Sequence, residues 1–269
     1  MKKHDSDRIR ERVRERYAGI AASGKRGCEC APSCCSPKAP SSKAQSAKLG
    51  YSKKDLDAVP EGADMGLGCG NPQAIANLKK GEVVLDLGAG GGFDCFLAAR
   101  QVGPRGQVIG VDMTPEMVAK ARENARKGRF KNVEFRLGEI EHLPVADSSV
   151  DVILSNCVIN LSPDKAQVYR DAYRVLKPGG RLAISDVVAI KPIPGAMRSD
   201  FEKHSGCVAG ALQVRALERI LKASGFRSVC VKVKEASKEF IKDWFPSSGV
   251  EQFVQSADVQ GEKPSADYS

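Results

Sequence analysis

The chain has 269 residues, of which 42 % are hydrophobic and 28 % are charged. This composition excludes a collagen-like, a largely disordered or a coiled-coil protein, and the length allows one sizeable core with an appendage or two small domains. The net charge of +9 is concentrated in residues 1–48, which carry 12 Lys and Arg against 5 Asp and Glu. No recognition-helix, zinc-finger or RNA-binding motif accompanies this basic leader, so we expect no nucleic-acid partner.

Residues 7–20 come first in the chain order of predicted elements. Ile9, Val13 and Tyr17 recur every four residues and predict a helix with a narrow apolar face that docks on another part of the molecule. Residues 23–48 are rich in Ser, Pro, Gly, Lys and Cys without periodicity, which predicts a flexible segment.

From residue 81 the pattern alternates between strands and helices. Short apolar runs predict strands over residues 83–87, 107–112, 132–137, 150–155, 181–187 and 227–235. Helical periodicity, with Thr114 as an N-cap and a Lys-Pro-Gly-Gly helix stop at residue 177, predicts helices over residues 93–102, 115–127, 165–176 and 211–224. This order predicts an α/β fold with a doubly wound, mainly parallel sheet. The polar tail after Gln255 is expected to be loose.

No apolar run approaches the ~18 residues of a membrane helix, and no apolar stretch follows the N-terminal charges as it would in a secretory signal. We therefore expect a cytoplasmic protein without a membrane partner, and a monomer.

A glycine-rich turn, Asp86-Leu87-Gly88-Ala89-Gly90-Gly91-Gly92, joins the first predicted strand to a helix. Glycines there let a ligand approach the backbone at the carboxyl edge of the sheet. Phe93 breaks the G-x-G-x-x-G pattern of dinucleotide-binding proteins, and Asp112 ends the second strand, where a carboxylate can take both hydroxyls of a ribose. The alternative is a purely structural glycine turn with a solvated Asp112.

Together, these features resemble the class I methyltransferase fold, which binds S-adenosylmethionine. The resemblance covers about residues 70–235. It implies that Gly138, Glu139 and Ile140 lie around the adenine and that Asn156 faces the methyl donor. The cofactor-binding residues it implies are Tyr51, Asp86, Gly88, Ala89, Gly90, Asp112, Met113, Gly138, Glu139, Ile140 and Asn156.

Nine cysteines in a chain without a secretory signal indicate thiol chemistry or soft-metal binding. Small or turn residues flank Cys69, Cys157 and Cys207, which predicts that they lie in loops near the methyl donor. Cys95 and Cys230 fall in a predicted helix and an alternating strand, and we expect both to be packed apolar residues. Four further cysteines cluster in the leader: Cys28, Cys30, Cys34 and Cys35.

Four stretches are more specific than the glycine turn: Gly50-Tyr51-Ser52, GLGCGNP at residues 66–72, SNCVINL at residues 155–161, and the loop of Cys207. They closely resemble arsenite S-adenosylmethionine methyltransferases. The resemblance implies that Cys157 and Cys207 bind As(III) and that Cys69 is either a third arsenic ligand or a redox thiol. It also implies an upstream catalytic cysteine, for which Cys34 and Cys35 are the preferred candidates.

The chemistry agrees with this resemblance. As(III) is a soft centre with a lone pair, so soft thiolates suit it and no general base is needed for methyl transfer. After transfer the arsenic is pentavalent, and a dithiol can return two electrons by becoming a disulfide. We expect glutathione or thioredoxin to reduce that disulfide, which the family resemblance places between Cys69 and a leader cysteine.

The resemblance also suggests three regions. Residues 1–48 form a helix and a Cys-rich segment, residues 49–190 the S-adenosylmethionine-binding domain, and residues 191–269 an arsenic-binding and sheet-completing region. Two rival functions stay open. A methyltransferase for a quinone-type molecule explains the glycine turn but not the cysteines, and a protein that sequesters soft metals or arsenic explains the cysteines but not an intact cofactor turn. A zinc site at Cys28–Cys35 lacks the usual ligand pairs.

Overall fold

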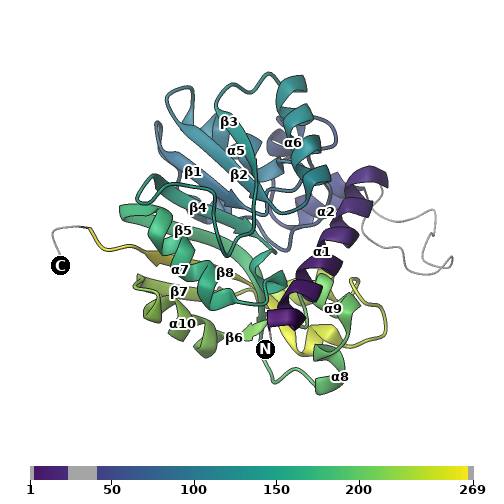
Figure 1. Cartoon of the computed structure of the whole chain (residues 1–269). Helices are drawn as coiled ribbons and strands as arrows, with labels where there is room; N and C mark the ends of the chain where they lie inside the picture. The colour runs from purple at the N-terminus through teal and green to yellow at the C-terminus, as the bar shows by residue number, and fades with distance from the viewer. Residues whose placement is uncertain (1–2, 24–40, 266–269) are drawn as a thin grey trace.

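The computed structural model describes residues 3–23 and 41–265, and Figure 1 shows a central β-sheet with helices on both sides. The strand order is β3-β2-β1-β4-β5-β8-β7, and the short β6 pairs with β5. Strands β1 to β5 run parallel along this path, whereas β8 is antiparallel to both β5 and β7. The strands are β1 (Val83–Leu87), β2 (Gln107–Asp112), β3 (Val133–Leu137), β4 (Val150–Asn156), β5 (Leu176–Ala189), β6 (Leu212–Gln213), β7 (Arg227–Val233) and β8 (Val254–Glu262). The predicted doubly wound, mainly parallel α/β fold is confirmed.

Two apolar cores lie on opposite faces of the sheet. Alternate residues of a strand point to opposite faces, so Val84 packs with Phe96 on one side and Leu85 packs with Tyr169 on the other. The burial of β1 on both faces fixes the position of the glycine turn at its carboxyl end. The covering helices are α5 (Phe93–Val102) and α6 (Pro115–Lys127) on the first face, and α7 (Lys165–Val175) and α10 (Val214–Ala223) on the second.

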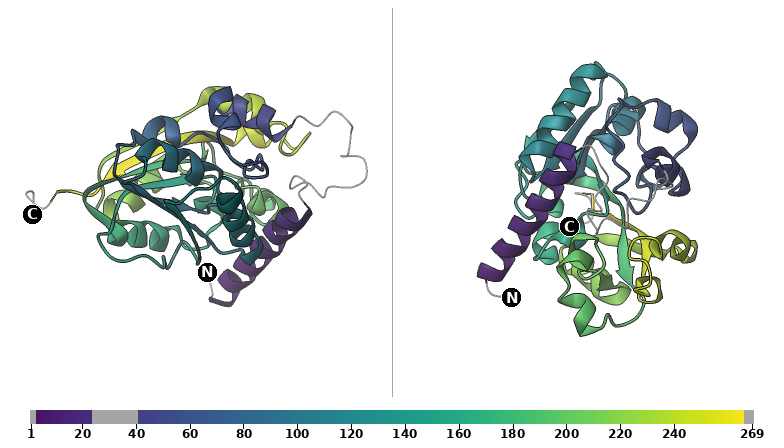
Figure 2. Two further views of the ribbon diagram at one scale, coloured as in Figure 1. Left: turned by 90° about the horizontal axis from the view of Figure 1, so that it is seen from above. Right: turned by 90° about the vertical axis from the view of Figure 1, so that its right-hand side faces the viewer.

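The N-terminal helix α1 (Lys3–Ser23) lies against the body of the protein, as Figures 1 and 2 show. Lys120 of α6 donates to the carbonyl of Ala21 at 3.4 Å, and the Arg12 guanidinium lies 4.4 Å from the centre of the Phe201 ring. The predicted docking helix is therefore confirmed. The other short helices are α2 (Ser42–Lys48), α3 (Lys53–Asp57), α4 (Gln73–Ala76), α8 (Gly195–Arg198), α9 (Phe201–Ser205) and α11 (Lys238–Ile241), and the 3-10 turns are Ile159–Leu161, Glu235–Ser237 and Val250–Gln252.

The predicted flexible segment over residues 23–48 is wrong for its last part. Helix α2 begins after Ser41, whose Oγ accepts from the Ala44 amide at 3.2 Å. The buried Ser46 Oγ donates to Asp64 at 2.8 Å, a contact 18 residues along the chain that composition does not reveal. The cysteines Cys28, Cys30, Cys34 and Cys35 lie outside the described residues.

The predicted loose tail is also wrong, because β8 is an internal strand of the sheet. Its polar side chains are buried with partners: Ser256 Oγ donates to the Cys69 carbonyl at 2.7 Å, and Asp258 accepts from Ser185 at 3.0 Å. Buried polar groups are tolerated when they are hydrogen-bonded. The next residue after each of them, Ala257 and Val259, is fully buried, which the polar composition concealed.

Smaller differences concern Cys230 and several element bounds, most of which shift by one or two residues. Cys230 is exposed, because the Val229, Val231 and Val233 side of β7 packs on the core while the other side faces outward. The prediction that Cys230 is packed is therefore wrong. The helix predicted over residues 165–176 ends at Val175, the strand predicted from residue 181 begins at Leu176, and the helix predicted from residue 211 begins at Val214 after β6.

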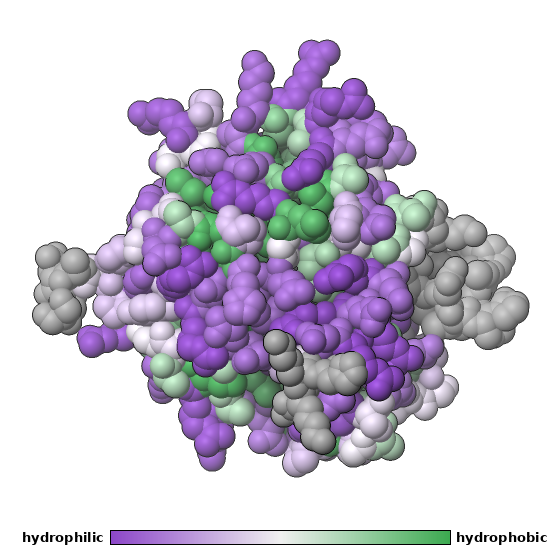
Figure 3. All heavy atoms as spheres, viewed as in Figure 1, coloured by the Kyte–Doolittle hydropathy of each residue, from purple (hydrophilic) through white to green (hydrophobic). Residues whose placement is uncertain are grey.

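The face seen in Figure 3 is largely hydrophilic and interrupted by smaller apolar patches. Within residues 3–23 and 41–265, no helix has both the length and the apolar composition to cross a membrane.

Candidate active site

A pocket of about 1110 Å³, including open solvent at its mouth, lies at the carboxyl ends of β1, β2 and β4. This is the edge at which open α/β sheets bind their ligands. Nine of the predicted cofactor residues line it: Tyr51, Asp86, Gly88, Ala89, Gly90, Asp112, Met113, Ile140 and Asn156. Gly138 and Glu139 are not lining residues. The Gly138 amide donates to the Asp112 carbonyl at 3.0 Å, and the Glu139 carboxylate faces Arg10 of α1.

The glycine turn presents its backbone to this pocket. Gly88 has a φ of +70°, and a Cβ there would collide with the Val158 side chain. Gly90 has a φ of +51°, and a Cβ there would meet nothing within 4 Å. Asp112 fixes the turn, because its carboxylate accepts from the amides of Gly90 at 3.0 Å and Thr114 at 2.9 Å. These two hydrogen bonds therefore order the glycine turn beside the pocket. Burial raises the pKa of Asp112.

A buried polar network joins three of the sequence stretches singled out above. The Tyr51 hydroxyl donates to Asp94 at 2.8 Å, and Asn156 Nδ2 donates to Tyr51 at 3.1 Å and to Asp94 at 3.2 Å. Asn156 Oδ1 accepts from the Cys69 amide at 3.0 Å. Burial raises the pKa of both Asp94 and Asp86, which disfavours their ionised forms. A cationic ligand in the pocket would stabilise the ionised carboxylates, so the two residues suit a positively charged ligand. Asp94 was missed in the sequence, although an acidic residue in the first turn of a helix beside a glycine loop is a usable signal.

Three thiols from distant parts of the chain meet beside the pocket. Cys69, Cys157 and Cys207 are 1 %, 6 % and 2 % exposed, and Cys207 Sγ donates to the Cys157 carbonyl at 2.9 Å. Cys157 and Cys207 have φ values of 61° and 63°, in the left-handed region. Such backbone costs about 1–3 kcal/mol for a residue other than glycine and is typical of functional sites. Of the three, Cys157 lines the pocket itself.

Two of the thiols, those of Cys69 and Cys157, favour the protonated form in this arrangement. Hydrogen bonds with Cys207 and Cys69, together with burial, raise the pKa of Cys157 well above its usual range. Burial raises the pKa of Cys69 to about 11. The Cys157 thiol therefore contacts the other two, and a ligand that bonds to the sulfurs of Cys69 and Cys157 would displace a proton from each.

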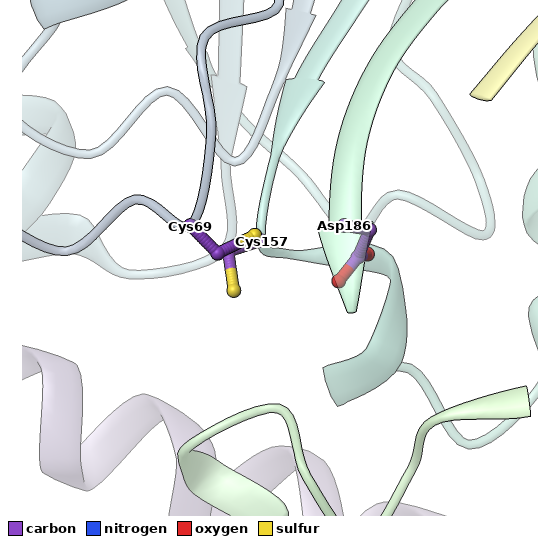
Figure 4. A group of neighbouring side chains, drawn as sticks. All are labelled: Cys69, Cys157 and Asp186. Atoms are coloured by element: carbon purple, nitrogen blue, oxygen red, sulfur yellow. The ribbon is translucent and has the colours of Figure 1, made fainter. Parts of the chain in front are cut away.

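A carboxylate completes the cluster, as Figure 4 shows. Cys69 Sγ, Cys157 Sγ and a carboxylate oxygen of Asp186 all lie within 4.8 Å of one another, and all three residues are buried. Cys157 follows β4, Asp186 lies on the neighbouring β5, and Cys69 belongs to the loop before α4. Burial raises the pKa of Asp186 to about 6. Asp186 was not predicted, because only the pairing of β4 with β5 brings it to the thiols.

Helix α1 closes one side of the pocket with Arg10, Val13 and Tyr17. Arg10 forms ion pairs with Glu139 at 3.4 Å and Glu141 at 3.1 Å. Burial raises the pKa of Tyr17, and the neighbouring thiols of Cys207 and Cys157 raise it further. Helix α1, which the sequence predicted only to dock, therefore forms one wall of the pocket and also lies beside the thiols of Cys157 and Cys207.

Comparisons with known proteins agree with this geometry. Residues 78–225 match a family model described as a methyltransferase domain. An arsenite methyltransferase of Halobacterium salinarum is 52 % identical over 270 residues, which is 98 % of this chain and 68 % of the relative. An arsenite methyltransferase of Mus musculus is 38 % identical over 188 residues, 65 % of this chain and 49 % of the relative.

Among solved structures, an arsenic(III) S-adenosylmethionine methyltransferase from Chlamydomonas reinhardtii superposes with a TM-score of 0.61. It is 33 % identical and covers 84 % of this chain and 74 % of its own. The chain spans about two thirds of the halobacterial relative and about half of the mouse relative. On the fold, the glycine turn, the thiol cluster and these similarities, the chain belongs to the arsenite methyltransferase family.

Proposed function

We propose that the protein transfers methyl groups from S-adenosylmethionine to thiol-bound As(III) and so produces methylated arsenicals in arsenic detoxification. One observation carries this proposal: Cys157 lines the ligand pocket and also contacts the buried thiols of Cys69 and Cys207. A methyl donor in the pocket and a soft acceptor on the thiols would therefore lie side by side.

The pocket residues suit S-adenosylmethionine, which supplies a sulfonium methyl group when bound. Asp86 and Asp94 offer negative charge to a cation, and Gly90 leaves room for close approach of the ligand to the backbone. Asp112 stands at the end of β2, where we assign it to the ribose hydroxyls. The apolar side chains of Met113 and Ile140 provide walls for the adenine, with Gly138 and Glu139 beside them.

The thiol cluster suits neutral arsenous acid. Each As–S bond forms as a thiol proton leaves with an arsenic hydroxyl as water, so the raised pKa values of Cys69 and Cys157 present no barrier at neutral pH. Cys157 and Cys207 are the proposed ligands, with Cys69 as the third. Residues 49–190 would then bind the cofactor, while residues 191–269 supply Cys207 and the strands that complete the sheet.

Methyl transfer is an in-line displacement. The arsenic lone pair forms the As–C bond while the electron pair of the C–S bond returns to sulfur. Because the nucleophile carries no proton, the residues only have to position the reactants and exclude water. Burial of the three thiols and closure by α1 serve both needs.

Return of the arsenic to the trivalent state needs two electrons, which a thiol pair supplies by becoming a disulfide. We assign this step to Cys69 and a leader cysteine, Cys34 or Cys35. The leader thiol loses its proton and bonds to the Cys69 sulfur as that sulfur leaves arsenic, and the electron pair of the As–S bond stays on arsenic. Glutathione or thioredoxin then reduces the disulfide. A reducing compartment such as the cytoplasm keeps these thiols available.

The test is a balance of methyl groups. Incubation with arsenite, S-adenosylmethionine and a thiol should yield methylated arsenic, measured by speciation, and one S-adenosylhomocysteine per methyl group. Cys157→Ser and Cys207→Ser should each abolish both products, since serine is a hard, protonated oxygen. Cys230→Ser, at the exposed cysteine of β7, is the matched control and should keep full activity.

Two results would favour the rival functions. Arsenite binding without any consumption of S-adenosylmethionine would indicate a sequestering protein. Consumption that depends on a quinone and not on arsenite would indicate an organic acceptor.

A further inference from the structure

We propose that the carboxylate of Asp186 stabilises the positive charge that arsenic acquires as it takes the methyl group. This inference rests on the proposed methyl transfer to arsenic and assigns a role to a buried group that the proposed function leaves without one. Asp186 lies within 4.8 Å of the sulfurs of Cys69 and Cys157, on the side of β5.

The reaction moves one positive charge through a buried site. Before transfer the charge lies on the sulfonium of the donor and the arsenic is neutral, bonded to three sulfurs. As the As–C bond forms and the C–S bond breaks, the donor becomes a neutral thioether and the arsenic a four-bonded arsonium cation. No proton or outside electron enters this step, so its balance is closed.

The carboxylates near the reacting groups fall into two sets, one beside the proposed position of the donor and one beside the proposed position of arsenic. Asp86 and Asp94 line the cofactor pocket, where they offer negative charge to the cationic donor before transfer. Asp186 lies in the thiol cluster and stabilises the charge after transfer. Only an interaction that is stronger in the transition state than in the ground state accelerates the chemical step, and Asp186 is placed to provide it.

The carboxylate is fixed before the reaction begins. Its Oδ1 accepts from the Val187 amide at 2.7 Å and from Asn160 Nδ2 at 2.9 Å. Within the described part of the chain it forms no ion pair within 4.0 Å; the Lys165 ammonium, which donates to the Ser162 carbonyl at 2.8 Å, acts on it only at longer range. A charge held by neutral donors in a dry site needs no reorganisation when the cation forms, which is the condition for strong electrostatic stabilisation.

A structural role predicts something different. Asp186 anchors Asn160, and through it the turn that carries Cys157. If this were its whole contribution, its removal would weaken arsenic binding and stability together with turnover. If the charge matters, its removal slows the chemical step while both ligands still bind.

The experiment uses Asp186→Asn, which keeps the shape of the side chain. Methyl transfer in a single turnover should slow by about 100-fold, the usual effect of losing one electrostatic contact to a transition state. The affinities for arsenite and S-adenosylmethionine, each measured by calorimetry, should change by less than about threefold. The control is Asp171→Asn, a buried carboxylate on α7 that pairs with Arg174 and does not line the pocket, which should methylate at the wild-type rate.

A second variant guards against misfolding. The substitution Asp186→Ser removes the same charge with a smaller polar side chain and leaves Asn160 its bond to the Val187 carbonyl. It should fold, as judged by thermal melting and cofactor binding, and should still transfer methyl slowly. Wild-type rates in either variant, or equal losses of arsenite affinity and rate, would overturn the inference. Failure of the wild-type protein to methylate arsenite would instead contradict the proposed function.

Discussion

At the residue scale, Asp112 orders two segments of backbone beside the cofactor pocket. Its carboxylate orders the glycine turn through Gly90 and the start of α6 through Thr114, and it faces the pocket where we place the ribose. Asp112→Ala should weaken S-adenosylmethionine binding by about 1.5–3 kcal/mol, since a charged acceptor and an ordered turn are lost together. Calorimetry measures this effect, with Glu116→Ala on the exposed side of α6 as the control. Unchanged affinity in Asp112→Ala would contradict the placement.

The reactivity of the thiols follows from their protonation. With a pKa of about 11, Cys69 is about one part in a thousand thiolate at pH 8, and only the thiolate reacts with iodoacetamide. Labelling of Cys69 should be slow and should rise about tenfold per pH unit between pH 7 and 9, because the thiolate fraction grows as pH approaches the pKa. Peptide mass spectrometry resolves each site. Labelling of Cys69 as fast as that of the exposed Cys230 at pH 8 would contradict the burial of the cluster.

At the scale of elements, α1 is part of the active site although it precedes the sheet by 60 residues. It supplies Arg10, Val13 and Tyr17 to the pocket, and its ion pairs with Glu139 and Glu141 hold it against the loop that follows β3. Glu141 is almost completely buried, so loss of its ion-pair partner destabilises the protein more than loss of a surface ion pair would.

Arg10→Ala should therefore loosen α1. We expect faster proteolytic cleavage near residues 3–23 and an affinity for S-adenosylmethionine lower by about 1–3 kcal/mol, because Glu141 loses its cationic partner. Arg8→Ala removes the same charge from an exposed position of the same helix and should change neither measurement. Equal effects of the two substitutions would show that only the net charge of α1 matters.

At the scale of the whole molecule, the leader combines structural and chemical parts. Because α1 and α2 both contribute to the pocket, a deletion of residues 1–48 would remove pocket walls as well as thiols. Replacement of Cys28, Cys30, Cys34 and Cys35 by Ser is the cleaner test. This variant should bind S-adenosylmethionine normally and complete one methyl transfer, but should lose repeated turnover from arsenite, because each cycle needs a disulfide-forming pair.

Single-turnover and multiple-turnover assays with thioredoxin as the only reductant separate these steps. Full multiple turnover of the four-serine variant would show that the leader cysteines take no part. Loss of the first turnover as well would show that they act in binding rather than in electron supply.

Local sequence patterns specify the elements around the site and the chemical classes of its residues. The strand at Val83–Leu87, the helix at Phe93–Val102 and the glycine turn between them follow from a hydrophobic period and from backbone needs that act within a few residues. The thiols and Asp112 could be chosen because their chemistry is carried by residue type and by position at a strand end.

Which distant residues meet depends on the packing of the folded chain. A polar segment became the inner strand β8 because Ser256 and Asp258 find partners, the first of them at Cys69, 187 residues away. Asp186 joins the thiols through the pairing of β4 with β5, and α1 becomes a pocket wall through ion pairs that span more than 100 residues. Such contacts leave no period in the sequence, because their energies depend on residues that only folding brings together.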